Sequence, residues 1–265
     1  APGKRPHPLR GRGGAIFSRV PDAETMLISE TFTSIQGEGS LTGVPSWFCR
    51  LSGCNLRCTW CDTPYASWKP EGDKRTVGEL IDEARATGVR HAVLTGGEPM
   101  IFPQLAPLAA GLKEAGFHIT IETAGTVDRA DVEFDLMSLS PKLSNSTPID
   151  DPRDVSGKWA RLHEARRIDV EALQGLIDRS GGPRARQIKF VVTGEGDRSD
   201  RDLAEIDELL GRLKGWKPEE VMLMPEGTAL PGRARTDAVV QVCMERGWRY
   251  CHRLHIELFG DTRGT

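Results

Sequence analysis

The octapeptide CNLRCTWC, residues 54–61, is the most informative stretch of this 265-residue chain. Its cysteines, Cys54, Cys58 and Cys61, follow one another at intervals of four and three positions. Such intervals would place them on one face of a helix, but the glycine, asparagine and proline residues around them favour a loop. Three thiolates in one loop indicate that the loop wraps around a metal centre.

Two kinds of metal centre are compatible with three clustered thiols. A closed zinc site needs four ligands, so zinc would also require Cys49 or a distant histidine. Cys49 lies in an apolar run typical of a core strand, which makes it a poor fourth ligand. A cubane four-iron cluster needs only three cysteines and leaves one iron open to an exogenous ligand. The spacing therefore favours an iron–sulfur cluster at which a substrate or cofactor binds.

A second motif, TGGEP at residues 95–99, comes directly at the end of a buried-type strand over 91–95. From Met26 onward, strand and helix patterns alternate. This α/β pattern predicts a mainly parallel sheet covered by helices and closed, or part-closed, as a barrel. In such folds the chemistry lies at the carboxyl ends of the strands, where both the cysteine loop and the TGGEP motif fall.

Apolar periodicity and turn residues predict the individual elements. A helix begins at Thr76, because Thr76 and Glu79 have the spacing of a capping box. One helix is expected around 159–179 and a last strand near 253–259. Further strands are expected at 26–33, 45–51, 117–121, 136–140, 187–192 and 221–224, and further helices at 103–115, 201–214 and 236–246.

Composition narrows the function classes. With 35 Lys and Arg against 38 Asp and Glu, the net charge of −3 provides no general field for a polyanion, so nucleic acid is not an expected partner. No apolar run approaches the length of a membrane span, so no membrane association is expected. Six cysteines are too few for a disulfide scaffold, and Cys243 and Cys251 are expected to be buried free thiols.

Residues 1–25 carry several arginines, glycines and prolines but no apolar segment of the kind found in secretory signals. We interpret them as a flexible N-terminal arm and residues 26–265 as a single catalytic domain. The missing signal and the sparse cysteines predict a cytoplasmic, reducing compartment.

The two motifs together resemble the radical S-adenosylmethionine superfamily, in which a C-x3-C-x2-C loop and a Gly-Gly-Glu-Pro turn occupy consecutive strand–helix units of an abbreviated TIM-type barrel. Within it, the chain resembles the 7-carboxy-7-deazaguanine synthase family over most of residues 27–260. The segments that carry this narrower resemblance are IQGEG at 35–39, FCRL at 48–51, GCNL at 53–56, CDT at 61–63, ETAGT at 122–126, LSPK at 139–142 and KFVV at 189–192.

The resemblance implies an activity and its cofactors. Members convert 6-carboxy-5,6,7,8-tetrahydropterin to 7-carboxy-7-deazaguanine with loss of ammonia, on the route to queuosine and other 7-deazapurines. They require a [4Fe–4S] cluster, S-adenosylmethionine, Mg²⁺ and an electron donor such as flavodoxin, and they are typically homodimers.

The resemblance also implies roles for residues. Cys54, Cys58 and Cys61 would ligate three irons, and S-adenosylmethionine would chelate the fourth. Its binding residues would be Trp60, Cys61, Asp62, Gly97, Glu98, Glu122, Ser140, Pro141, Lys142, Met224, Pro225, Glu226 and Gly227. Thr63 would be the Mg²⁺ ligand, which is unusual because hard cations prefer carboxylates, and Asp62 is therefore kept as the second candidate.

The pterin would contact Ile35, Gln36, Gly37, Glu38, Arg50, Thr95 and His255. An anionic substrate in a closed site needs a cation, and Arg50 can supply a bidentate pair to its carboxylate. The alternative for Arg50 is an ion pair with Glu38 at the rim of the site. His255 could equally be an ordinary strand histidine.

Two other functions fit the cysteine loop. An activase that forms a glycyl radical on a partner protein would share the motif and the shortened barrel. A non-catalytic zinc module would share only the thiols. The crossover at 143–186 and the last residues, 260–265, have no role in the resemblance.

Overall fold

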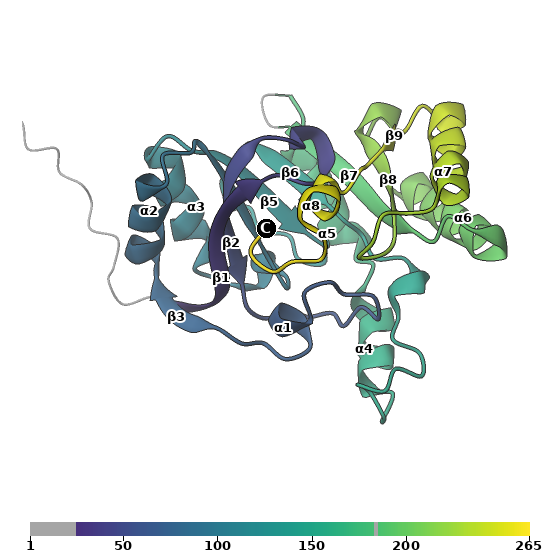
Figure 1. Ribbon diagram of the computed structural model, residues 1–265, viewed down its shortest axis with the longest axis horizontal. Coiled ribbons are helices and arrows are strands. Elements are labelled where there is room, and N and C mark those ends of the chain that lie inside the picture. The colour runs from purple at the N-terminus through teal and green to yellow at the C-terminus, as the bar shows by residue number, and fades with distance from the viewer. Residues whose placement is uncertain (1–24, 183–184) are drawn as a thin grey trace, which may run out of the picture.

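A computed structural model describes residues 25–182 and 185–265, and Figure 1 shows their arrangement. The strands are β1 (Thr25–Ile35), β2 (Pro45–Leu51), β3 (Asp73–Thr76), β4 (His91–Gly96), β5 (His118–Thr123), β6 (Leu136–Leu139), β7 (Ala185–Val192), β8 (Val221–Pro225) and β9 (Arg249–Tyr250). The α-helices are α1 (Pro64–Ser67), α2 (Val77–Ala86), α3 (Leu105–Glu114), α4 (Lys158–Arg166), α5 (Val170–Arg179), α6 (Gly196–Arg212), α7 (Arg233–Arg246) and α8 (Leu254–Phe259).

The described strands form one nine-stranded sheet in the order β3-β1-β2-β4-β5-β6-β7-β8-β9. Strand β1 pairs antiparallel with β2 and β3. From β2 to β9 every pairing is parallel. The predicted α/β class and parallel sheet are confirmed, and of the two closures expected, the partial barrel is the one observed. That residues 26–265 form a single domain stays a prediction, which this continuous sheet supports.

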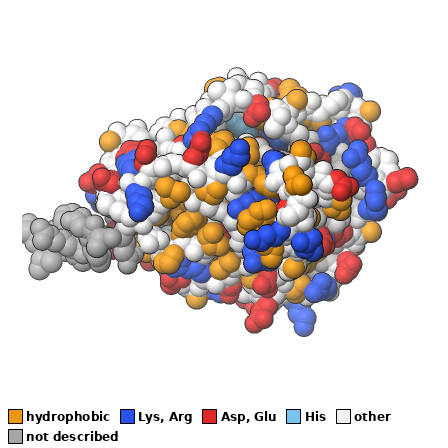
Figure 2. Space-filling view, turned by 90° about the horizontal axis from the view of Figure 1, so that it is seen from below, with side chains coloured by type: hydrophobic (Ala, Val, Ile, Leu, Met, Phe, Trp, Pro, Cys, Tyr) orange, Lys and Arg blue, Asp and Glu red, His pale blue; other side chains and the backbone are white. Residues whose placement is uncertain are grey.

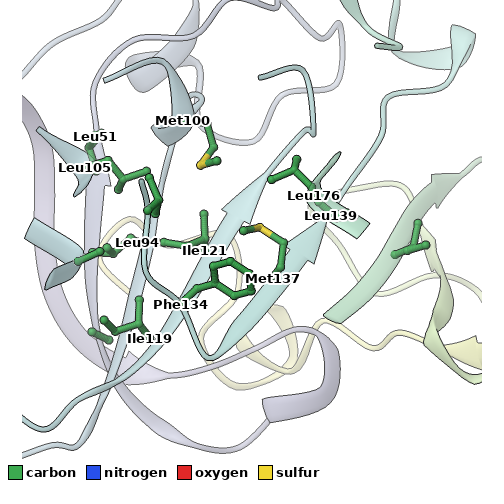
Figure 3. Close-up of a cluster of buried hydrophobic side chains, with 14 of the residues drawn as sticks. Leu51, Leu94, Met100, Leu105, Ile119, Ile121, Phe134, Met137, Leu139 and Leu176 are labelled. Atoms are coloured by element: carbon green, nitrogen blue, oxygen red, sulfur yellow. The ribbon is translucent and has the colours of Figure 1, made fainter. Parts of the chain in front are cut away.

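Along the parallel strands, side chains point alternately into the core and toward the concave face of the sheet. On β2, Trp47, Cys49 and Leu51 are fully buried in the core that the covering helices share. Phe48 and Arg50, between them, face the other side and line a cavity. Figure 3 shows the same core continuing through β4, β5 and β6, where side chains of these strands meet those of α3 and α5. The two-residue period of a strand thus places each side chain either in the core, where it contributes to stability, or at the cavity.

Capping side chains begin two of the helices, of which one was expected from the sequence. The Thr76 hydroxyl accepts from the Glu79 amide at 3.2 Å, and the Glu79 carboxylate accepts from the Thr76 amide at 2.8 Å. This confirms the predicted capping box. Asp169 caps α5 by accepting from the Ala172 amide at 2.9 Å. The single helix expected over 159–179 is therefore wrong, because Asp169 has extended backbone and begins a second helix.

The strand expected near 253–259 is also wrong. These residues form the short helix α8, while the last strand is β9, at Arg249–Tyr250. Short runs of alternating apolar residues do not distinguish helix from strand. The amide of Leu254 donates to the carbonyl of Gly37 at 2.9 Å, so the segment leaves the sheet and crosses its concave side. Figure 1 shows α8 and the C-terminal segment in front of the sheet.

Strand β3 was not expected, because its sequence DKRT has no apolar period. Its pairing with β1 forms it. Cys243 and Cys251 are buried free thiols, as predicted. The flexible arm expected at 1–25 lies almost wholly outside the described residues. Among the residues that are described, no helix is both long and apolar enough to cross a membrane.

His91, at the start of β4, is a buried histidine between two hydroxyls. Its Nδ1 lies 2.5 Å from the Ser46 hydroxyl and its Nε2 2.9 Å from the Thr120 hydroxyl. Burial, and to a smaller degree His118, lowers the pKa of His91 to about 4. The unfolded chain takes up a proton here below about pH 6.5, whereas the folded chain does so only near pH 4.

We expect stability to fall as the pH drops from about 6.5 toward 4, and His91→Gln to reduce this dependence by about 1 to 3 kcal/mol. Glutamine can still meet both hydroxyls but does not titrate. Urea unfolding of both proteins at pH 7 and pH 4.5, under anaerobic conditions, measures the difference. Equal losses of stability in both proteins would contradict the assignment.

Candidate active site

A cavity of about 480 Å³ lies on the concave face of the sheet, among the carboxyl ends of the parallel strands and the loops that follow them. It gathers most of the predicted site residues. Those that line it are Ile35, Gln36, Gly37, Glu38, Arg50, Cys54, Cys58, Trp60, Cys61, Asp62, Thr63, Thr95, Gly97, Glu122, Ser140, Lys142, Met224 and His255. Those that do not line it are Glu98, Pro141, Pro225, Glu226 and Gly227.

The three cysteines of the 54–61 loop all face this cavity. Cys49 does not, because its thiol points to the opposite face of β2 and is buried with Trp47. In the described part of the chain, no three His, Cys, Asp or Glu side chains converge as the ligands of one ion would. Three thiols that line one cavity suit a cubane cluster, in which each cysteine binds a different iron.

Burial controls the state of these thiols when no metal is bound. It raises the pKa of Cys54 to about 12, with Glu98 adding to the effect, and it raises the pKa of Cys58 further. Both groups are therefore protonated at neutral pH. Since thiolates are the metal ligands, loading of iron must displace these protons.

The crossover after β6 holds the backbone of the cysteine loop. The Arg57 amide donates to Nδ1 of His163 at 3.1 Å, and the Thr59 amide donates to the Ser146 carbonyl at 2.8 Å. Because Nδ1 accepts, the His163 proton lies on Nε2, which is 2.9 Å from the Ser146 hydroxyl. Burial lowers the pKa of His163 to about 4, which keeps this ring neutral. Part of the unexplained 143–186 segment is thus the wall behind the cysteine loop.

The TGGEP turn is packed directly on that loop. A Cβ at Gly97 would lie 2.2 Å from the Gly53 carbonyl oxygen, and one at Gly96 would lie 2.2 Å from that of Leu51. Gly96 also has a φ of +148°, which favours glycine. The Glu98 amide donates to the Gly53 carbonyl at 2.9 Å. The two motifs are therefore joined backbone to backbone.

Glu98 is fully buried behind this turn. Its carboxylate accepts from the Met100 amide at 3.0 Å, the Thr123 hydroxyl at 2.7 Å and the Ala124 amide at 2.8 Å. Burial raises its pKa, while these donors and Lys142 lower it in part. The side chain ties the end of β4 to the end of β5 and leaves the cavity to the backbone of the turn.

A buried lysine, Lys189 on β7, joins two carboxylates in the cavity. Its ammonium lies 2.5 Å from Glu38 and 3.3 Å from Glu122. Burial by itself would raise the pKa of Glu38, but Lys189 and Arg253 lower it to about 2. The same carboxylates raise the pKa of Lys189 against its burial. The Lys189 role was not predicted, although a lone lysine in the apolar run IKFVV is a signal that could have indicated it.

Arg50 forms an ion pair, but not with the predicted partner. Its Nε lies 2.6 Å from Glu30 on β1, so the expected alternative of a pair with Glu38 is wrong. The two residues are register partners on antiparallel strands, which explains their contact. The Tyr65 hydroxyl also donates to Glu30, at 2.9 Å.

The C-terminal segment forms another wall of the site. His255 faces the cavity from α8 and packs on the turn at Gly37, where a Cβ would lie 2.0 Å from its Nδ1. Residues 260–265 line the cavity as well. Arg263 pairs with Glu30 at 3.1 Å and Glu71 at 2.7 Å. The sequence offered no signal for this wall, because its contacts join residues more than 190 positions apart.

Comparisons with known proteins agree with this geometry. Residues 50–142 match the radical SAM superfamily. The chain is 47 % identical over 242 residues to "7-carboxy-7-deazaguanine synthase" of Rhodopirellula baltica, covering 91 % of this chain and 89 % of that protein. It is 42 % identical to the protein of the same name in Halobacterium salinarum, covering 92 % and 94 %. It also resembles the crystal structure of QueE from Escherichia coli, with a TM-score of 0.64, 29 % identity and coverage of 87 % and 95 %.

The partial barrel, the cysteine loop and the TGGEP turn define an enzyme of the radical SAM superfamily, which implies a [4Fe–4S] cluster and S-adenosylmethionine as cofactors. The sequence match over nine-tenths of the chain identifies the family more narrowly than the two motifs do. The chain belongs to the 7-carboxy-7-deazaguanine synthase family. This membership decides against the zinc module and the glycyl-radical activase as alternatives.

Replacing a cavity cysteine should remove the cluster. We expect Cys58→Ala to lose its iron and visible absorbance after anaerobic reconstitution, because one of three ligands is gone. Cys49→Ala is the matched control: it also removes a buried thiol but should keep its iron. Iron and sulfide content per chain measure both. Iron retained by Cys58→Ala and lost by Cys49→Ala would place the ligands elsewhere.

Proposed function

We propose that this chain converts 6-carboxy-5,6,7,8-tetrahydropterin to 7-carboxy-7-deazaguanine with release of ammonia, a step toward queuosine and related 7-deazapurines. The observation that carries the proposal is the 47 % identity to a 7-carboxy-7-deazaguanine synthase over 91 % of this chain. The cavity supports it, because thiols, carboxylates and cationic side chains line one space.

We assign Cys54, Cys58 and Cys61 to the cluster. The neighbouring part of the cavity lining, which includes Trp60, Gly97 and Lys142, is assigned to S-adenosylmethionine. When bound, these cofactors supply a carbon radical that abstracts hydrogen from the substrate. The chain contributes position and the exclusion of water. Gly97 lets the cofactor approach the backbone closely. Lys142, whose ammonium lies 5.6 Å from the Trp60 ring centroid, would hold the adenosyl part together with that ring.

The charged side chains of the cavity are suited to bind a small anionic substrate whose ring has polar edges. Glu30 engages Nε of Arg50, so the guanidinium is oriented and its remaining N–H groups can grip the pterin carboxylate. Lys189 keeps Glu38 ionised, and an ionised carboxylate accepts hydrogen bonds from the N–H groups of a pterin. Both contacts need water to be excluded, which the C-terminal wall supports by covering the cavity.

We place Mg²⁺ at Thr63, which lines the cavity beside the cysteine loop. Asp62 is the second choice, because its carboxylate lies 3.5 Å from Arg253 and already has a cation nearby. One hydroxyl cannot hold Mg²⁺ alone, since this ion requires about six oxygens. The proposal therefore has Mg²⁺ bind together with the pterin, whose oxygens would complete its coordination.

We propose that a one-electron donor such as flavodoxin reduces the cluster, and that two copies of the chain form a homodimer. All six cysteines are free thiols, which supports a reducing, cytoplasmic compartment.

Anaerobic turnover tests the function. Enzyme supplied with 6-carboxytetrahydropterin, S-adenosylmethionine, Mg²⁺ and reductant should form 7-carboxy-7-deazaguanine, detected by mass spectrometry. Arg50→Gln should raise KM about tenfold to hundredfold, because a charge-assisted contact to the carboxylate is lost. Arg75→Gln is the control, since Arg75 also pairs with a glutamate but lies outside the cavity. No product from the wild type would refute the function.

The metal assignment has its own test. Thr63→Ala should raise the Mg²⁺ concentration needed for half-maximal rate by about tenfold, because an oxygen ligand is removed. Asp62→Asn should change it less. A Mg²⁺ response that survives in Thr63→Ala but is lost in Asp62→Asn would reverse the two assignments.

A further inference from the structure

Arg57 is a buried cation inside the cysteine loop and has no role in the assignments above. The residue is 8 % exposed. Its Nη1 donates to the carbonyls of Cys54 and Leu56, each at 2.7 Å. The guanidinium carbon lies 4.0 Å from the ring centroid of Trp159 on α4. Two backbone carbonyls, one of them from a cluster ligand, and one aromatic face thus hold the charge in place.

The guanidinium has a donor that the protein does not use. Its Nε is buried and has no hydrogen-bond partner among the described residues. A buried unpaired donor costs about 1 to 3 kcal/mol, so this arrangement needs a compensating attraction. Burial lowers the pKa of Arg57, and Cys54, Cys61 and Cys58 each raise it. All three cluster ligands are therefore within electrostatic range of this cation.

Other charges near the cysteines are neutralised or lie at the cavity wall. Arg153 influences Cys61 but is paired with Asp151 at 2.6 Å. Lys142 influences Cys58 and donates to the Ser140 hydroxyl, in the region assigned to S-adenosylmethionine. Asp62 and Glu98 act with the opposite sign, on Cys58 and Cys54. Arg57 is inside the loop itself and forms no ion pair with the residues that the structure describes.

We propose that Arg57 sets the reduction potential of the cluster, as a fixed positive charge that favours the reduced state. The inference rests on the proposed function only through the cluster and its three cysteine ligands. Reduction takes one electron from a one-electron donor, which is oxidised by one electron, and no proton moves. The site gains one negative charge, so a nearby cation stabilises the reduced form more than the oxidised form.

This role also gives the crossover a function. Helix α4 supplies Trp159, which holds the guanidinium against the loop, and the same helix carries exposed cations. Figure 2 views the molecule from below Figure 1, the side on which α4 projects, and shows Lys and Arg side chains gathered on that face. Exposed charges are screened by water and salt, whereas a buried charge is screened much less. An exposed arginine of α4, Arg166, is therefore a matched control.

An anaerobic redox titration of the cluster-loaded enzyme, followed by the electron paramagnetic resonance signal of the reduced cluster, tests the proposal. At a fixed solution potential, Arg57→Gln should lower the ratio of reduced to oxidised cluster about tenfold or more, a shift of about 59 mV or more toward negative potential for one electron. Arg57→Lys keeps the charge and should show a smaller decrease. Arg166→Gln should match the wild type.

An unchanged potential in iron-replete Arg57→Gln would overturn the proposal, as would an equal shift in Arg166→Gln. Should Arg57→Gln fail to hold iron, Trp159→Leu decides, because it keeps the charge but removes the ring that holds it. It should lower the ratio, and a wild-type value would overturn the proposal. The titration contains no pterin, so a failure to form 7-carboxy-7-deazaguanine leaves this result intact, and the reverse also holds.

Discussion

The site depends on the contact between the TGGEP turn and the cysteine loop, which the Glu98 amide makes while the buried Glu98 carboxylate anchors the turn. A buried carboxylate without a cation is costly unless its oxygens are well satisfied. Here two amides and a hydroxyl from the end of β4 and of β5 satisfy it. The Glu98 amide meanwhile holds the Gly53 carbonyl, one residue before the first cluster ligand. Loss of this side chain would leave buried donors unpaired and would remove the anchor of the turn on which the cysteine loop is packed.

The alternation of side chains along the strands also determines where each residue lies. Because side chains alternate between faces, the neighbours Cys49 and Arg50 have opposite surroundings: one is in the core, and the other lines the cavity. A shift of one residue in the pairing of β1 with β2 would reverse every such assignment. Glu30 and Arg50 are opposite each other in this register. Their ion pair therefore orients the Arg50 guanidinium and also depends on the correct pairing of the two strands.

Local features could be predicted from the sequence and distant ones could not. The capping box at Thr76 and the cysteine spacing depend on residues a few positions apart, and the capping box is confirmed. The partner of Arg50, the helix at 254–259 and the pairing of Lys189 depend on which segments meet across the sheet. Glu38 and Lys189 are separated by 151 positions, and no periodicity reports such a contact. Lys189 also lies within an apolar run. Because a buried parallel strand is apolar on both faces, this pattern does not show which face its side chain is on.

The cysteine loop differs from small metal domains that fold only around their ion. Its backbone groups already have protein partners: the Thr59 amide binds the Ser146 carbonyl, and the Cys58 carbonyl accepts from the Trp68 indole at 3.0 Å. The Arg57 amide is likewise bound by His163. Because the protein satisfies these groups, the shape of the loop does not depend on iron for its hydrogen bonds. The free energy of iron binding is then available for deprotonating buried thiols, whose raised pKa values oppose that step.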